Sequence, residues 1–145
     1  MMLEVIKYLV LLIFLATEGI RDFKWRKISV VSSGIFGVMG VVLQITDLKD
    51  TWIDLMAGMM IGAVLLVLSK ITSEKIGYGD GIVLMVTGIY LGFSGNFMLL
   101  SLGMLFSSAV SIVLLILRKA TKKTELPFVS FMFGSYFIMC VNQLI

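Results

Sequence analysis

Residues 68–93 read LSKITSEKIGYGDGIVLMVTGIYLGF, and this stretch decides the fold because the chain changes character twice within it. It is polar from Lys70 to Lys75 and apolar again from Ile82. The tetrapeptide Gly77-Tyr78-Gly79-Asp80 lies between these two parts, so we expect Asp80 at the mouth of an apolar helix. The two glycines permit unusual backbone angles and allow another chain to approach closely.

The composition of the chain predicts a membrane protein. Of its 145 residues 59% are apolar, and the mean hydropathy of +1.08 is far above the norm for soluble domains. A bilayer core of about 30 Å takes roughly 20 helical residues, and the apolar runs supply about six such segments. We therefore expect residues 1–145 to form a single all-α integral-membrane domain with six transmembrane helices, in the cell membrane.

The expected segments are short and closely spaced. They run from about Leu3 to Ile20, Ile28 to Ile45, Trp52 to Leu68, Gly81 to Phe93 and Phe97 to Leu117, and from the Leu126-Pro127-Phe128 stretch to about Val141. The fourth is too short to span a bilayer, so its helix starts deep in the membrane or begins before Asp80. Gly92 to Asn96 is predicted to be a turn, and Gly58 and Gly62 a helix-packing notch.

Basic residues predict the orientation. With the N-terminus outside, ten of the 12 Lys and Arg residues fall in cytoplasmic loops, which the positive-inside rule favours. These ten are Arg21, Lys24, Arg26, Lys27, Lys70, Lys75, Arg118, Lys119, Lys122 and Lys123. We therefore predict an N-out/C-out topology with Asp22 and Asp80 both at the cytoplasmic face. The net charge of +3 is explained by this topology and does not indicate a nucleic-acid partner.

Missing residue types narrow the chemistry. The chain has no histidine, which excludes a Ser-His-Asp triad and a histidine-based zinc site. Its one cysteine, Cys140, excludes an intrachain disulfide and a cysteine-rich zinc site. Carboxylates are the main acid and base groups that remain, and we expect neither a metal nor a cofactor.

Asp22 and Asp80 are the candidate catalytic residues. Two aspartates that share one proton hydrolyse a peptide bond when one activates water and the other polarises the carbonyl group. Other readings remain open for each residue. Asp22 lies among four cations and suits a salt-bridged loop, whereas Asp80 suits a helix N-cap.

Three elements resemble the type IV prepilin peptidase family, the G-x-G-D membrane aspartyl proteases to which the preflagellin peptidases are related. They are the stretch from Asp22 to Ile28, the tetrapeptide Gly77-Tyr78-Gly79-Asp80, and Leu126-Pro127-Phe128. The resemblance implies cleavage of the basic leader of prepilin-like or pseudopilin-like subunits at the cytoplasmic face, next to the subunit's hydrophobic helix. It also implies that Gly77, Tyr78 and Gly79 form an active-site loop.

Two positions depart from the family's pattern. The family often has Ile-Pro after the first aspartate, where this chain has Ile28-Ser29, and often a basic residue at the position of Ile82. Longer members carry a methyltransferase domain, for which this chain has no room, so we expect a short form that does not methylate its product. These departures bear on substrate preference and leave both aspartates in place.

The expected partners are a prepilin-like substrate and membrane lipid, and the sequence does not determine the oligomeric state. Glu18, Glu74 and Glu125 are candidate contacts for the basic leader, because all three are expected near the cytoplasmic face. Two other functions stay open: a small carboxylate-driven transporter or proton channel, and an inactive scaffold for pilus assembly. Transporters tend to have internal repeats and acids at mid-membrane, which this sequence does not display.

Overall fold

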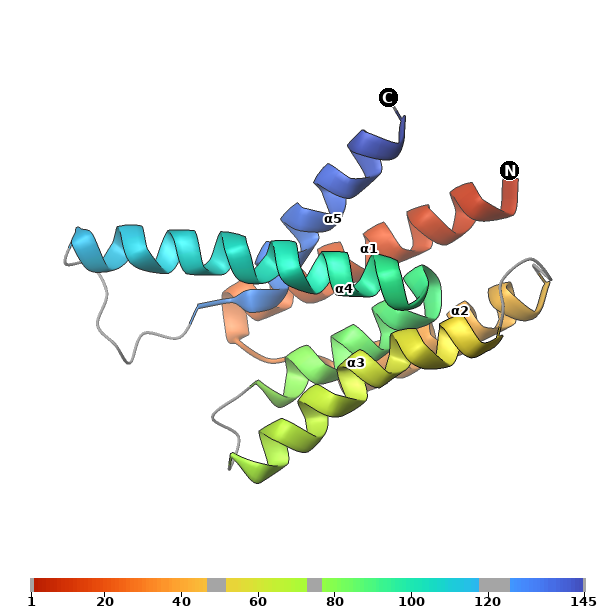
Figure 1. The fold of residues 1–145 in the computed structure, drawn as a ribbon, viewed down its shortest axis with the longest axis horizontal. Helices are drawn as coiled ribbons and strands as arrows, with labels where there is room; N and C mark the ends of the chain where they lie inside the picture. Colours follow the sequence, from red (N-terminus) through yellow and green to blue (C-terminus); the bar gives the residue numbers. More distant parts are fainter. Residues whose placement is uncertain (1, 47–51, 73–76, 118–125, 145) are drawn as a thin grey trace.

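The computed structural model describes residues 2–46, 52–72, 77–117 and 126–144, with side chains up to 141. Its helices are α1 (Met2–Trp25), α2 (Val30–Thr46), α3 (Trp52–Ile71), α4 (Tyr78–Ile116) and α5 (Phe128–Leu144). All regular structure in these ranges is helical, which confirms the predicted all-α class (Figure 1).

The longest helix, α4, is two helices joined at Gly92. This glycine has φ 64° and ψ −168°, a conformation that residues with a side chain rarely adopt. The first free N–H of the second helix, on Phe93, donates to Oδ1 of Asp54 at 3.1 Å. The predicted five-residue turn is therefore wrong in extent, because one glycine reverses the chain and helix resumes at Phe93 (Figure 1).

Buried amide and hydroxyl groups join the two parts of α4 to α3. The side-chain amide of Asn96 donates to the carbonyls of Gly58 and Leu84, both at 2.9 Å, and its oxygen accepts from the Thr87 hydroxyl at 2.7 Å. Asn96, predicted to lie in a turn, is instead helical and fully buried. A satisfied network of this kind fixes one arrangement of the surrounding helices.

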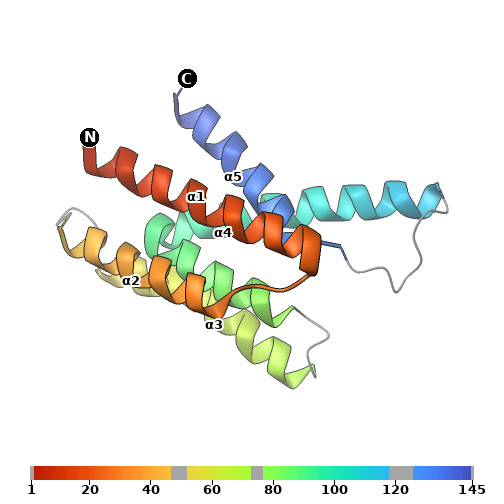
Figure 2. The ribbon, with the colours of Figure 1, turned by 180° about the vertical axis from the view of Figure 1, so that it is seen from behind.

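Glycines allow α3 and the first part of α4 to pack backbone against backbone (Figures 1 and 2). A Cβ at Gly58 would collide with the carbonyl oxygen of Gly88, and one at Gly62 with the carbonyl oxygen of Gly81. The predicted packing notch at Gly58 and Gly62 is confirmed, since only glycine permits this approach.

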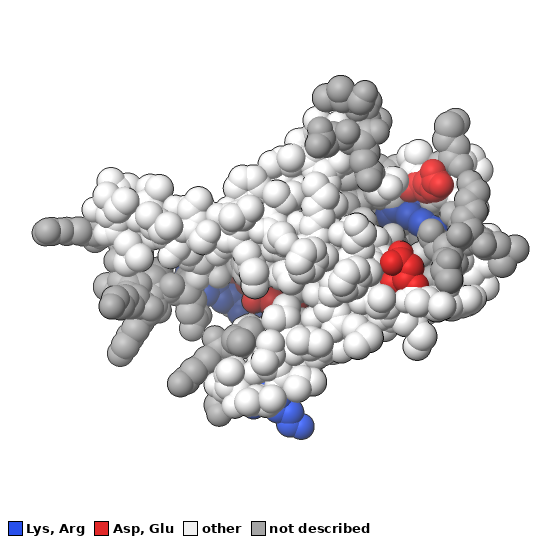
Figure 3. Space-filling model, in the orientation of Figure 1, with Lys and Arg blue, Asp and Glu red and all other residues white. Residues whose placement is uncertain are grey.

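The outer surface suits a lipid environment. In Figure 3 charged side chains occupy small areas of an otherwise uncharged face. Large apolar side chains point outward, with Val31, Ile53 and Ile116 each more than 70% exposed. Helices α3 and α4 are long and apolar enough to cross a membrane, and Val30–Thr46 and Phe128–Val141 are shorter apolar helices. Six transmembrane helices and the N-out/C-out orientation stay predictions.

Candidate active site

The first aspartate lies in the last turn of α1. The apolar run was predicted to end at about Ile20, but the helix continues to Trp25, because residues 21–25 contain no glycine or proline to stop it. The N–H of Arg26 still donates to the carbonyl of Asp22 at 2.9 Å, and Arg26 then ends the helix with φ 50°. Asp22 is therefore held on a helix and is not in a loop.

A backbone group of α5 holds the carboxylate of Asp22. Its Oδ2 accepts the N–H of Val129 at 2.9 Å, and the side chain is 8% exposed. Val129 lies in the first turn of α5, where backbone N–H groups have no partner within the helix. Burial raises the pKa of Asp22, while the N–H groups of Val129 and Ser130 and the charge of Arg26 oppose this rise.

The second aspartate lies in the first turn of α4. The N-cap residue is Gly77, and no side chain makes a capping hydrogen bond there. The interpretation of Asp80 as the N-cap is therefore wrong. The helix begins at Tyr78, before Asp80, as one of the two predicted alternatives requires. The expected active-site loop of Gly77, Tyr78 and Gly79 is therefore wrong for Tyr78 and Gly79, which belong to the first turn of the helix. Asp80 precedes the apolar run of α4, which starts at Gly81.

The two glycines of the tetrapeptide make room for their neighbours. A Cβ at Gly77 would collide with the carboxylate of Asp80, and a Cβ at Gly79 would lie 2.5 Å from Cγ1 of Ile28. Because Gly77 has no side chain, the Asp80 carboxylate can turn back over the start of α4. The absence of a side chain at Gly79 lets Ile28, in the α1–α2 connection, press against the tetrapeptide.

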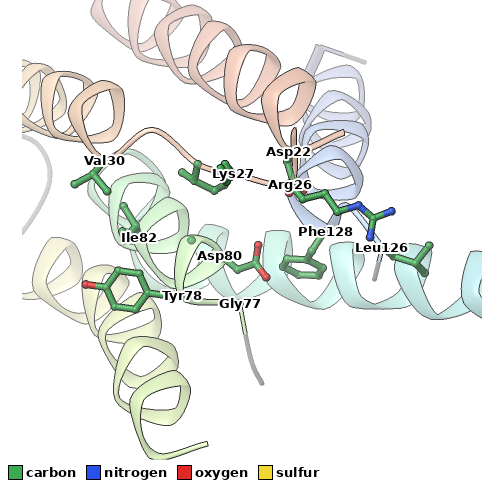
Figure 4. A pocket seen from close by; sticks show the side chains of 12 residues that line it. Asp22, Arg26, Lys27, Val30, Gly77, Tyr78, Asp80, Ile82, Leu126 and Phe128 are labelled. Carbon is green, nitrogen blue, oxygen red and sulfur yellow. The ribbon is translucent and has the colours of Figure 1, made fainter. Parts of the chain in front are cut away.

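Asp22 and Asp80 line one pocket of about 550 Å³ (Figure 4). The other lining residues come from the α1–α2 connection, the starts of α2 and α4, and the stretch before α5. They are Arg26, Lys27, Ile28, Val30, Gly77, Tyr78, Gly79, Ile82, Leu126 and Phe128. Burial and the negative charge of Asp22 raise the pKa of Asp80 to about 7. Near neutral pH the pocket can therefore hold one ionised and one protonated carboxyl group.

Sequence reasoning missed the backbone partner of Asp22. The N–H of Val129 is 107 residues away in the chain, and no side-chain pattern indicates that it points at a carboxylate. A usable signal was Pro127, because proline directly before a helix marks a start whose N–H groups need partners.

Of the three candidate contacts for the leader, the structure describes only Glu18. Glu74 and Glu125 lie outside the described residues. Glu18 was expected near the cytoplasmic face, within reach of the leader, but its side chain is fully buried and does not line the pocket. Its Oε2 accepts the N–H of Ser29 at 3.0 Å, and its Oε1 has no hydrogen-bond partner among the described residues.

No metal-binding group appears in the described ranges. Within them, no three histidine, cysteine, aspartate or glutamate residues lie close enough together to hold a metal ion. Among the described residues, the carboxyl groups that line the pocket are those of the two aspartates, beside Arg26, Lys27 and Tyr78.

Comparison with known protein families adds a match. The model of the type IV leader peptidase family covers residues 9–117, from within α1 to the end of α4. The matched range contains both aspartates and the Gly77-Tyr78-Gly79-Asp80 tetrapeptide. No curated protein and no solved structure matches the chain significantly.

Proposed function

The chain belongs to the type IV leader peptidase family, and on this premise we propose that it is an aspartyl endopeptidase which removes the basic leader of prepilin-like proteins. Family membership makes it a membrane protease with a prepilin-like substrate. The use of Asp22 and Asp80 as the catalytic pair is our proposal, as is a multi-pass arrangement with both at the cytoplasmic face. No observation favours the transporter or proton channel.

The observation that supports this mechanism is that a buried carboxyl group, of Asp22, and a partly buried one, of Asp80, line the same pocket (Figure 4). Hydrogen bonding from Val129 and the charge of Arg26 favour the ionised form of Asp22. Among the described residues no such donor opposes the effect of burial on Asp80, whose pKa of about 7 keeps it substantially protonated near neutral pH. We therefore assign the base to Asp22 and the acid to Asp80, within a pair that titrates as a unit.

Hydrolysis then follows in two steps. A water oxygen attacks the scissile carbonyl carbon, Asp22 takes a proton from that water, and Asp80 gives its proton to the carbonyl oxygen. In the resulting gem-diol, Asp22 returns its proton to the amide nitrogen as the C–N bond breaks. Asp80 takes back a proton from one hydroxyl group, which restores the starting state of the pair.

The leader must be held while this occurs. Glu74 and Glu125 remain proposed contacts for its basic residues. The burial of Glu18 excludes the same role for its side chain in this conformation, and its bond to Ser29 favours a positioning role. The exposed Tyr78 borders the pocket, where its ring can contact the leader.

The test is cleavage of a prepilin-like substrate by purified protein in detergent or lipid, with the product identified by mass. We expect Asp22→Asn, Asp80→Asn and the double variant to be inactive while folding normally, because Asn keeps the size of Asp. Asp54→Asn is the matched control, since Asp54 lies outside the pocket and Asn keeps an acceptor for the N–H of Phe93. Near-parental cleavage by folded Asp80→Asn would falsify the aspartyl mechanism.

A further inference from the structure

A second cavity, of about 560 Å³, lies between α2 and the first part of α4, with Met59 of α3 at its side. The active-site pocket and this groove share three lining residues, Val30, Tyr78 and Ile82. The two hollows therefore lie next to each other. The remaining lining residues are Ser33, Gly34, Gly37, Val38, Val41, Val42, Met85, Val86 and Ile89.

The groove leads from the aspartates along the helices. On α2 it extends from Val30 to Val42, and twelve helical steps of about 1.5 Å give a length of about 18 Å. On α4 it extends from Tyr78 to Ile89, a similar length. Its walls are almost entirely apolar. A polypeptide lying across the active-site pocket can therefore continue along this apolar groove.

Packing leaves this groove open on the α2 side. A Cβ at Gly34 would have no atom within 4 Å, and one at Gly37 would only reach ordinary contact with Val86 and Ile89. Between these two glycines, the carbonyl of Phe36 accepts a hydrogen bond from the Tyr90 hydroxyl at 2.7 Å, so α2 is nevertheless fixed to α4. The space at Gly34 is a feature of a docked helix and not of a loose one.

One polar group in the groove lacks a partner. The side chain of Ser33 is 2% exposed, and its hydroxyl has no hydrogen-bond partner among the described residues. A buried hydroxyl is costly to leave unpaired, and this one lines the groove. Ser33 and Gly34 are neighbours on α2, and the open space over Gly34 is where an occupant of the groove can lie.

We propose that the groove binds the apolar segment of the substrate on the C-terminal side of the scissile bond. This rests on the proposed peptidase function and adds where the substrate's membrane segment lies. Figure 4 shows Val30, Ile82 and Tyr78 on one side of Asp80 and Arg26 and Leu126 on the other. The groove adjoins the pocket on the side of Val30, Tyr78 and Ile82 and not on the side of Arg26 and Leu126. The groove is too small for a whole helix, so it receives one row of side chains.

Gly34→Leu tests the proposal because Gly34 lines the groove and a Cβ at this position has no atom within 4 Å, so the leucine side chain takes up space in the groove. With a substrate that includes its apolar segment, we expect KM to rise at least tenfold with kcat nearly unchanged. With a short peptide that ends a few residues after the scissile bond, we expect no change. Gly134→Leu is the matched control, since Gly134 on α5 also has open space and lies outside the groove.

Other outcomes overturn the proposal. Equal loss with both substrates would mean that Gly34→Leu distorts the active site, and no loss with either would mean that lipid or nothing occupies the groove. If the parent cleaves neither substrate, the proposed function fails first and this inference fails with it. The Gly134→Leu control separates these cases from general damage to the fold.

Crosslinking gives a second measurement that does not depend on the short peptide. Cys140 is the only cysteine, so Cys140→Ser with Gly34→Cys leaves a single thiol, in the groove. We expect it to form a disulfide with a cysteine placed in the substrate's apolar segment and not with one placed in the leader. Equal crosslinking to both, or to the leader alone, would contradict the assignment.

Discussion

The end of α1 and the start of α4 each bring one aspartate to the active-site pocket, yet the surroundings of the two carboxyl groups differ. Asp22 accepts a backbone N–H from α5 and lies near the charge of Arg26, so its ionised form has support. Burial disfavours the ionisation of both aspartates, but at Asp80 the charge of Asp22 adds to this effect and no hydrogen-bond donor among the described residues opposes it. Two residues of the same type thus acquire different protonation from their positions on the fold.

The largest expected effect comes from replacing either aspartate by asparagine. Asp22→Asn removes the base and Asp80→Asn removes the acid, so each should lower kcat by about 10³-fold or more. The double variant should fall to the same floor, since residues that act as a unit are not additive. Single-turnover cleavage measures this directly. A double variant about 10³-fold below either single variant would mean that the two act independently.

The second effect concerns the support of Asp80. Gly79→Ala places a Cβ 2.5 Å from Cγ1 of Ile28, so the start of α4 or the α1–α2 connection must move. Displacement of a catalytic group by about 1 Å costs roughly 10²-fold in rate, which is the loss we expect. Adding Ile28→Ala removes Cγ1 and should restore part of the activity.

A matched substitution serves as the control for this second effect. Gly134→Ala adds the same methyl group where no atom lies within 4 Å, and it should leave the rate unchanged. If Ile28→Ala fails to restore any activity to Gly79→Ala, the contact between Ile28 and Gly79 is not the reason that position 79 lacks a side chain.

The helical segments and the tetrapeptide were predictable because they depend on local sequence. Apolar runs identify helices, and Gly77-Tyr78-Gly79-Asp80 is a motif of four consecutive residues. The end of α1 was not predictable in this way, because Arg26 ends the helix with a positive φ that ordinarily belongs to glycine. Nor was the length of the turn at Gly92, which depends on Asp54 of another helix.

Long-range partners explain the remaining differences. That Asp22 meets Val129 and that Glu18 meets Ser29 depends on how helices dock, and no local pattern encodes it. Glu18 was expected near the cytoplasmic face and within reach of the leader, and its full burial departs from this because glutamates are seldom fully buried. The exception follows from the α1–α2 connection, which folds over this side chain and supplies its hydrogen-bond donor.

The third effect is on stability and distinguishes the two aspartates by pH. The pKa of Asp80 is about 7 in the folded protein against 3.8 as the ordinary value, so folding stability from this group falls as pH rises between about 4 and 7. Three pKa units correspond to about 4 kcal/mol, which partial solvent access reduces to about 2 kcal/mol. Asp80→Asn should therefore be about 2 kcal/mol more stable than the parent at pH 8 and nearly equal to it at pH 4.

Asp22→Asn should gain less at pH 8, because the N–H of Val129 and the charge of Arg26 already stabilise the ionised Asp22. Unfolding of the purified variants in detergent at both pH values measures the difference. A larger gain for Asp22→Asn than for Asp80→Asn would reverse the assignment of base and acid.

The smallest expected effect comes from Glu18, which holds the α1–α2 connection. This connection follows the helix that carries Asp22 and contacts the tetrapeptide that carries Asp80. The carboxylate of Glu18 accepts the N–H of Ser29, the residue before α2, and so fixes the connection whose Ile28 presses on Gly79. Glu18→Leu leaves that N–H unpaired and should lower kcat about tenfold with KM little changed, whereas Glu18→Gln keeps an acceptor and should recover most of the rate. Ser29 stands where related peptidases often have proline, which has no N–H to leave unpaired, so Ser29→Pro should partly rescue Glu18→Leu. A rise in KM without a fall in kcat for Glu18→Leu would instead support a leader contact, and failure of both the Gln variant and the proline rescue would exclude the bond to Ser29 as the cause.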